Sequence, residues 1–221
     1  MNWESKFKDN LLQVLYRSDQ PRDEKGRWTS GGSASPGSAD KVYDWALNKF
    51  GDPDTARNFT EWFGDSKVVD GEGSPLTVYH GTTADFDEFA AGPITKSGHG
   101  DQMSGMYFTP RPAMAELFAD YTAIVRGEWD EHDKTTGQKM YPAYLSVKNP
   151  RIYTNAEDFQ GADRLSLEAQ GYDGAIRKLD GGIMEIVVFN PTQIKSATGN
   201  KGTFDPNNPN ITLIIKSDKK P

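Results

Sequence analysis

The sequence predicts an α+β fold, and two observations support this class. Segments with the period of helices and segments with the period of strands are mixed along the chain, without the regular βαβ alternation of a parallel sheet. The strand-like segments are short and are bounded by turn residues such as Asp180-Gly181-Gly182. With 221 residues, the chain is long enough for one compact domain with an appendage, or for two small domains.

The N-terminal part predicts a helix followed by a linker. Residues 2–17 place Trp3, Phe7, Leu11, Val14 and Leu15 on one helical face, which is expected to dock on the domain or on a partner protein. Residues 18–39 differ in character from this helix, and their second half is rich in Gly, Ser and Pro, which is typical of a linker. We therefore predict the helix and linker in residues 1–38, a folded domain in residues 39–214 and a polar tail in residues 215–221.

Two helices are expected where the folded domain begins. Ser38 can cap a helix over residues 39–50, and Gly51-Asp52-Pro53 ends it. Residues 54–63 predict a second amphipathic helix, which Gly64 ends.

The remainder of the domain is expected to consist mainly of strands. Residues 68–69 and 76–80 predict a hairpin around the turn at 70–73. Further strands are expected at 105–109, 144–147, 173–177 and 184–189, and further helices at 112–124 and 165–170.

Composition excludes several classes of function. The formal net charge of -7 opposes non-specific binding to nucleic acid phosphates, although it leaves a nucleic acid open as a substrate. There is no cysteine, and therefore no thiolate nucleophile and no cysteine-bound zinc. The histidines His80, His99 and His132 lack metal-ligand spacing, so we expect no metal.

Known motifs and targeting signals are also missing from the sequence. It contains no Rossmann glycine fingerprint, no P-loop and no Gly-x-Ser-x-Gly elbow. No apolar run is long enough to span a membrane, and the N-terminus lacks the apolar core of a signal peptide. We therefore expect a cytoplasmic protein that does not bind membranes.

Three short stretches carry residues that could take part in binding or catalysis. Val78-Tyr79-His80-Gly81-Thr82 ends an apolar strand with a histidine, a glycine that allows a ligand to approach the backbone, and a hydroxyl. In Gly105-Met106-Tyr107-Phe108-Thr109, the adjacent aromatic residues must face opposite sides of a strand. Glu185 opens the otherwise apolar run 186–189. Taken singly, each stretch is explained as well by an ordinary turn, core strand or strand edge.

Together, and in this order, the three stretches resemble the ADP-ribosyltransferase superfamily in its His-Tyr-Glu branch, which diphtheria-like toxins and poly-ADP-ribose polymerases share. The similarity is greater to such domains in phage and mobile-element proteins of the polyvalent type. It extends over residues 55–210 and includes Trp62-Phe63-Gly64-Asp65-Ser66-Lys67-Val68-Val69, Gly171-Tyr172-Asp173-Gly174 and Lys195-Ser196-Ala197-Thr198-Gly199-Asn200. The resemblance implies a split mixed β-sheet with flanking helices.

The resemblance also implies NAD as co-substrate and a role for each motif residue. Gly81 would bind the carboxamide of nicotinamide, and His80 the ribose on the adenosine side. Tyr107 would stack on nicotinamide, and Glu185 would bind the 2′-hydroxyl of the nicotinamide ribose and orient the attacking group. His80, Tyr107 and Glu185 are thus the expected catalytic residues.

The remaining expected NAD contacts are Thr82, Phe108, Phe118 and Tyr121, and Phe118 and Tyr121 are alternative candidates for a second stacking aromatic. A serine that binds the carboxamide in the polymerases is replaced here by Ala115, for which Thr82 or Thr109 is expected to substitute. Arginine-directed transferases carry Gln or Glu two residues before the catalytic Glu, where this chain has Ile183, which disfavours arginine as the acceptor.

The resulting hypothesis is a mono-ADP-ribosyltransferase that modifies a host macromolecule, with a protein as the expected target and a nucleic acid as the alternative. Residues 22–32 resemble linkers in phage head-associated proteins, so we expect an effector in the cytoplasm of a bacterial host, with delivery by a phage particle as one route. Two alternatives stay open. One is an NAD glycohydrolase toxin, in which water is the acceptor, and the other is a non-enzymatic interaction module that keeps the fold.

Overall fold

The structure is a computed structural model that describes residues 38–90, 103–116, 118–119 and 139–212. The predicted N-terminal helix, almost all of the linker, the polar tail and Tyr121 lie outside these ranges. In the described residues, no helix is both long and apolar enough to cross a membrane.

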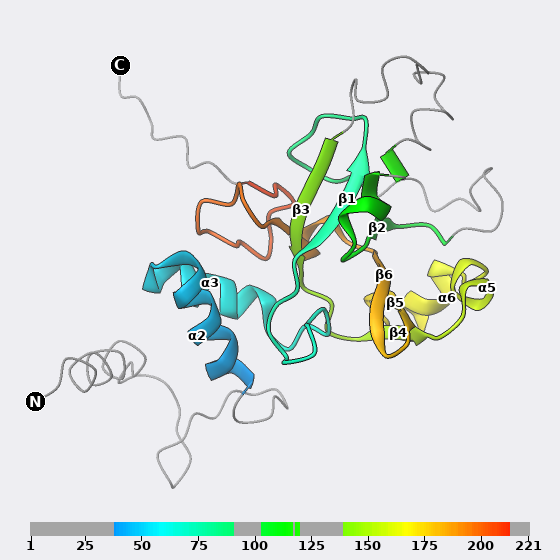
Figure 1. Cartoon of the computed structure of the whole chain (residues 1–221), viewed down its shortest axis with the longest axis horizontal. Coiled ribbons are helices and arrows are strands. Elements are labelled where there is room, and N and C mark those ends of the chain that lie inside the picture. The colour runs from blue at the N-terminus through cyan, green and yellow to red at the C-terminus, as the bar shows by residue number, and fades with distance from the viewer. Residues whose placement is uncertain (1–37, 91–102, 117, 120–138, 213–221) are drawn as a thin grey trace, which may run out of the picture. The chain divides into compact units, whose positions relative to one another are not determined.

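The described chain forms two β-sheets (Figure 1). The first is antiparallel, in the order β1 (Val78–Thr82), β3 (Lys139–Leu145) and β7 (Ile194–Ser196). The second has the order β2 (Met106–Phe108), β6 (Gly182–Val188), β5 (Gly174–Leu179) and β4 (Pro150–Tyr153), and only its β4–β5 pair is parallel. This arrangement confirms the α+β class and the split mixed sheet expected from the resemblance.

Helices α2 (Ser38–Phe50) and α3 (Pro53–Phe63) pack against each other, and both contact β3 through aromatic rings. The rings of Trp45 and Phe59 meet the ring of Tyr144 on β3, with centroids 5.3 and 5.2 Å away. Helix α3 begins one residue earlier than predicted, because the carboxylate of Asp52 accepts a hydrogen bond from the N–H of Thr55 and caps it. Gly64, with a positive φ of 55°, ends it as expected.

Helices α5 (Ala156–Gln160) and α6 (Arg164–Ala169) lie beside the second sheet (Figure 1). Phe159 of α5 and Leu167 of α6 are buried against Ala175 of β5 and Val187 of β6. The opposite face of β6 presents Ile186 and Val188 to the main core, together with Val78 of β1. Strand β6 therefore separates two apolar clusters, and its side chains alternate between them.

Several described elements differ from the sequence-based expectations. Strand β4 was not predicted, and it begins at Pro150, which is tolerated because β4 is at the edge of the sheet. Helix α5 and strand β7 were not predicted, since each is too short for a clear period. Strand β3 begins at Lys139 rather than at 144.

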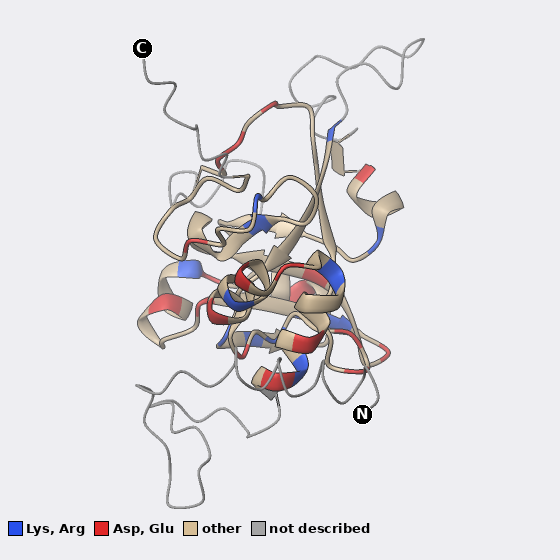
Figure 2. Ribbon diagram, turned by 90° about the vertical axis from the view of Figure 1, so that its left-hand side faces the viewer, with Lys and Arg blue, Asp and Glu red and all other residues tan. Residues whose placement is uncertain are grey.

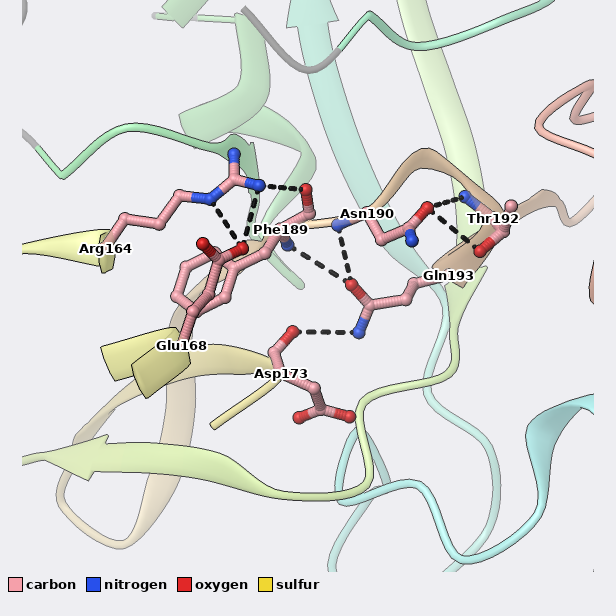
Figure 3. Close-up of polar contacts among 7 residues, drawn as sticks. All are labelled: Arg164, Glu168, Asp173, Phe189, Asn190, Thr192 and Gln193. Atoms are coloured by element: carbon pink, nitrogen blue, oxygen red, sulfur yellow. Dashed lines mark hydrogen bonds and ion pairs between the residues drawn. The ribbon is translucent and has the colours of Figure 1, made fainter. Parts of the chain in front are cut away.

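One side chain joins the two sheets at the end of β6 (Figure 3). The amide oxygen of Gln193, in the short helix η1 (Pro191–Gln193), accepts hydrogen bonds from the N–H groups of Phe189 and Asn190 at 3.2 and 2.8 Å. Its amide nitrogen donates to the carbonyls of Ser146 and Asp173 at 3.1 and 2.9 Å. Both ends of the amide are thus used to hold β6 and the start of β5 against the end of β3.

Candidate active site

The two sheets meet where β1 passes β2. The N–H of Tyr79 donates to the carbonyl of Thr109 at 2.8 Å, and the N–H of Thr109 donates back at 3.0 Å. If this antiparallel ladder continued, Gly81 would be opposite Tyr107. Instead, the carbonyl of Tyr107 binds Nδ1 of His80 at 2.8 Å. The strands therefore separate just after their one bridge.

This separation leaves the backbone of Gly81 directed into the split between the sheets. Successive residues of an antiparallel strand direct their N–H and C=O groups to opposite sides. The N–H and C=O of Tyr79 point toward Thr109. Gly81 lies two residues further along the strand, so its N–H and C=O point to the same side, away from its partner Met140 on β3. A donor and an acceptor thus lie next to each other on one residue, in the geometry that a carboxamide requires.

Gly81 is also in close contact with a helix. Residues 112–116 and 118–119 are helical, and a Cβ atom added to Gly81 would lie 1.6 Å from the carbonyl oxygen of Ala115. That distance is a collision with backbone, which no side-chain rotation can relieve. Only glycine allows the helix to approach β1 this closely.

His80 is held neutral and in one orientation. Its ring packs against Phe89 and Phe108, with centroids 5.0 and 5.5 Å away. Burial lowers the pKa of His80 below its ordinary value, and the hydrogen bond to Tyr107 only partly opposes this effect. Because a carbonyl can only accept, Nδ1 carries the proton, and Nε2 of the neutral ring is an acceptor.

Tyr107 and Phe108 face opposite sides of β2, as the alternation of a strand requires. Phe108 is 2% exposed and lies in the main core. Tyr107 is half-buried on the other side, where its hydroxyl donates to the carbonyl of Met103 at 2.7 Å and its ring meets the edge of Phe159. Burial, and next the charge of Glu185, raise the pKa of Tyr107 well above its usual range, so the hydroxyl keeps its proton.

Glu185 lies on the same face of the second sheet as Tyr107. Tyr107 is paired with Val187 on β6, and Glu185 precedes Val187 by two residues, so their side chains share a face. Glu185 is 8% exposed, and Nε of Arg177 donates to its Oε2 at 2.6 Å. The structure therefore places Tyr107 and Glu185 on one face of the second sheet, and it links His80 on β1 to the backbone of Tyr107.

Sequence reasoning did not single out Arg177, and the reason is a β-bulge. A regular hairpin around Asp180-Gly181 would place Arg177 opposite Met184. The register shifts between Arg177 and Lys178, so that Arg177 pairs with Glu185 and Met184 has no paired residue. The isolated carboxylate in an apolar strand was the one signal that a cation should be sought nearby.

The other residues predicted to contact NAD lie in different surroundings. Thr82 is buried beside Gly81, and Phe118 is partly buried in the helix that follows β2. Phe108 contacts His80 from the core, so a direct contact between Phe108 and NAD stays a prediction. The hydroxyl of Thr109 already donates to the carbonyl of Met184, whereas that of Thr82 only accepts, from the N–H of Ala84.

A cavity of about 400 Å³ lies elsewhere, at the junction that Gln193 holds together (Figure 3). Its walls include Trp62, Lys148, Asp173 and Gln193, and no predicted site residue lines it. The side chains of Asp173 and Gln193 already bind backbone groups, so this cavity belongs to the junction between the sheets.

Lys and Arg are interspersed with Asp and Glu over the described part of the chain (Figure 2). Within that part, no group of three or more His, Asp or Glu side chains could hold a metal ion.

Comparison with known proteins gives one match. Residues 70–204 match the family described as ADP-ribosyltransferase in polyvalent proteins, and this range contains all three motifs and Arg177. No curated protein sequence matches the chain.

The contact between Gly81 and Ala115 predicts that Gly81→Ala is destabilising. The added methyl group must displace the helix backbone, and such overpacking costs about 1–3 kcal/mol. Urea unfolding should show this loss, and amide exchange at residues 112–116 should accelerate. Gly71→Ala is the matched control, because a Cβ there meets nothing within 4 Å. Equal stability of the two variants would contradict the close approach.

Burial of His80 predicts that stability falls in mild acid. Below the ordinary pKa of 6.5, the unfolded chain binds a proton that the folded ring still refuses, so the free energy of unfolding declines as pH falls. His80→Asn, which can keep the bond to the carbonyl of Tyr107, should show a shallower decline between about pH 7 and pH 5. The measurement is the free energy of unfolding by denaturant at several pH values. An equal slope against pH in wild type and in His80→Asn would contradict this prediction. Because the two proteins differ only at residue 80, the contributions of all other residues to the pH dependence cancel in the comparison.

Proposed function

Because the chain belongs to the ADP-ribosyltransferases found in polyvalent proteins, we propose that it cleaves the bond between nicotinamide and ribose in NAD and transfers the ADP-ribose to an acceptor. The observation that carries this proposal is the juxtaposition of the three motif residues. His80 binds the backbone of Tyr107, and Tyr107 shares a sheet face with Glu185. These residues are far apart in the sequence, so their meeting is specific to the fold.

The split between the sheets supports recognition of nicotinamide. The N–H and C=O of Gly81 are directed into it and suit the oxygen and nitrogen of a carboxamide. Of the two hydroxyls considered as a further carboxamide ligand, Thr82 is the better candidate, because the proton of Thr109 is already donated to Met184. Tyr107 and Phe118 are proposed to stack on the two sides of the nicotinamide ring.

His80 is proposed to bind the ribose on the adenosine side. Its Nε2 is an acceptor, since Nδ1 donates to the carbonyl of Tyr107. A ribose hydroxyl is a donor, so the two groups are complementary. The low pKa of His80 keeps Nε2 free of a proton at neutral pH, and NAD binding through this residue should weaken in acid.

The proposed reaction breaks the C1′–N bond of NAD. The bonding electron pair moves to the ring nitrogen of nicotinamide and cancels its positive charge, so the leaving group needs no general acid. Positive charge develops on the ribose, where the carboxylate of Glu185 stabilises it and binds the 2′-hydroxyl. The acceptor then forms its bond to C1′ and releases its proton to Glu185 or to water.

The acceptor is proposed to be a macromolecule of a bacterial host, with a protein as the first expectation, and the chain to act as a phage-associated effector. Ile183, at the place where arginine-directed transferases carry Gln or Glu, disfavours arginine as the modified residue. Hydrolysis of NAD, with water as the acceptor, is the competing function that uses the same residues.

We predict that Glu185→Gln lowers the rate of nicotinamide release by at least about 100-fold, because loss of one transition-state contact costs ~3 kcal/mol. Binding of NAD, measured by calorimetry, should persist. Glu168→Gln is the matched control, since it also removes a carboxylate from an ion pair with an arginine, on α6. Full activity of Glu185→Gln would remove this residue from its role. No NAD binding or turnover in either wild type or variant would favour a non-enzymatic module.

Incubation of the protein with NAD labelled in its adenosine half and a bacterial lysate separates transfer from hydrolysis. We expect label in macromolecules, and mass spectrometry of the labelled fraction should identify the modified residue or base. Release of nicotinamide with all label remaining in small molecules would contradict transfer and support hydrolysis. Glu185→Gln in the same lysate is the control for labelling by other enzymes.

A further inference from the structure

The carboxylate of Glu185 is held from one side by a single guanidinium. Nε of Arg177 donates to Oε2 at 2.6 Å, and Nη2 contacts the same oxygen. The side chains of Arg177 and Glu185 are only 14% and 10% exposed. The pair is therefore shielded from water, and the other oxygen, Oε1, is not used by Arg177.

Among the described residues, this guanidinium contacts the carboxylate directly and orients it. From β2, Tyr107 faces Glu185, but its hydroxyl donates to the carbonyl of Met103. From the helices, the side chains packed on this face include Phe159 and Leu167, which are apolar. Arg164 of α6 is occupied by Glu168 and by the carbonyl of Phe189.

The backbone is shaped to make this contact. The bulge that leaves Met184 without a paired residue moves Glu185 opposite Arg177. The carbonyl of Met184 is in turn held by the hydroxyl of Thr109, which follows β2. The bulge is therefore anchored by the same residue that bridges the two sheets, Thr109.

We propose that Arg177 is the positioning residue for Glu185. It holds Oε2 so that Oε1 faces the ribose of NAD. This inference rests on the proposed function, since it assigns a role to the residue that supports the carboxylate of that reaction.

Removing the guanidinium should affect the reaction more than the binding of NAD. Arg177→Met leaves Glu185 free to rotate and without a cation, so a largely buried carboxylate takes up a proton more readily. The neutral acid stabilises positive charge on ribose poorly. We expect kcat for nicotinamide release to fall about 10- to 100-fold, with KM for NAD changed by less than about threefold.

The pH dependence distinguishes positioning from a merely structural effect. In Arg177→Met, the acid limb of the kcat profile should lie at higher pH than in wild type. Arg177→Lys keeps the charge but cannot place two donors on one oxygen, so it should keep the wild-type limb and recover part of kcat. Arg57→Met is the matched control, because it breaks an exposed ion pair with Asp54.

Unfolding in urea tests whether Arg177→Met is folded. The midpoint should fall in Arg177→Met, because one partner of a shielded pair is left alone, and should recover at least in part in Arg177→Met combined with Glu185→Gln. Such recovery shows that the two side chains act on each other in the folded protein.

The outcomes separate the two proposals. A wild-type rate and pH profile in Arg177→Met would overturn the positioning role and leave the proposed function standing. A lower kcat with an unmoved acid limb, and no recovery in Arg177→Lys, would reduce Arg177 to a structural residue and also overturn it. Absence of nicotinamide release by wild type would overturn the proposed function and this inference together.

Discussion

The two hydrogen bonds between Tyr79 and Thr109 are the constraint on which the rest of this fold depends. They fix β1 of one sheet beside β2 of the other, and the strands separate immediately afterwards. If they continued as a ladder, the backbone of Gly81 would be paired and the carbonyl of Tyr107 would be unavailable to His80. The separation of the strands therefore leaves the backbone of Gly81 directed into the split, where the proposed carboxamide contact requires it.

A split sheet needs a second attachment, and Gln193 provides it at the other end of β6. Its amide satisfies four backbone groups of segments that belong to both sheets. These four hydrogen bonds connect the end of β6 and the start of β5 to the end of β3, so they oppose separation of the sheets there. The positions of His80 and Glu185 relative to each other follow from these two attachments.

The sequence correctly places His80, Tyr107 and Glu185 on strands, because the apolar period or the glycine of each strand is visible locally. What escapes prediction depends on contacts between distant segments. Arg177 faces Glu185 only because of a bulge, which no local pattern shows. Strand β7 contains Lys195, which resembles a surface residue, yet it is fully buried and donates to the carbonyls of Asn208 and Asn210 at 2.5 and 3.2 Å. Burial lowers the pKa of Lys195 to about 8, which shows how strongly tertiary contacts override its polarity.

Stability alone does not account for a charged pair in the second sheet. Well-packed apolar residues at the positions of a shielded ion pair are often as stabilising or more so. The neighbours on this face, Val187 and Ala175, show that the site accommodates apolar side chains. Arg177 is explained by the presence of Glu185, because a lone carboxylate so little exposed would be unfavourable. Glu185 itself has no such explanation from packing, and its place on an apolar strand beside Tyr107 is what the catalytic role proposed for it requires.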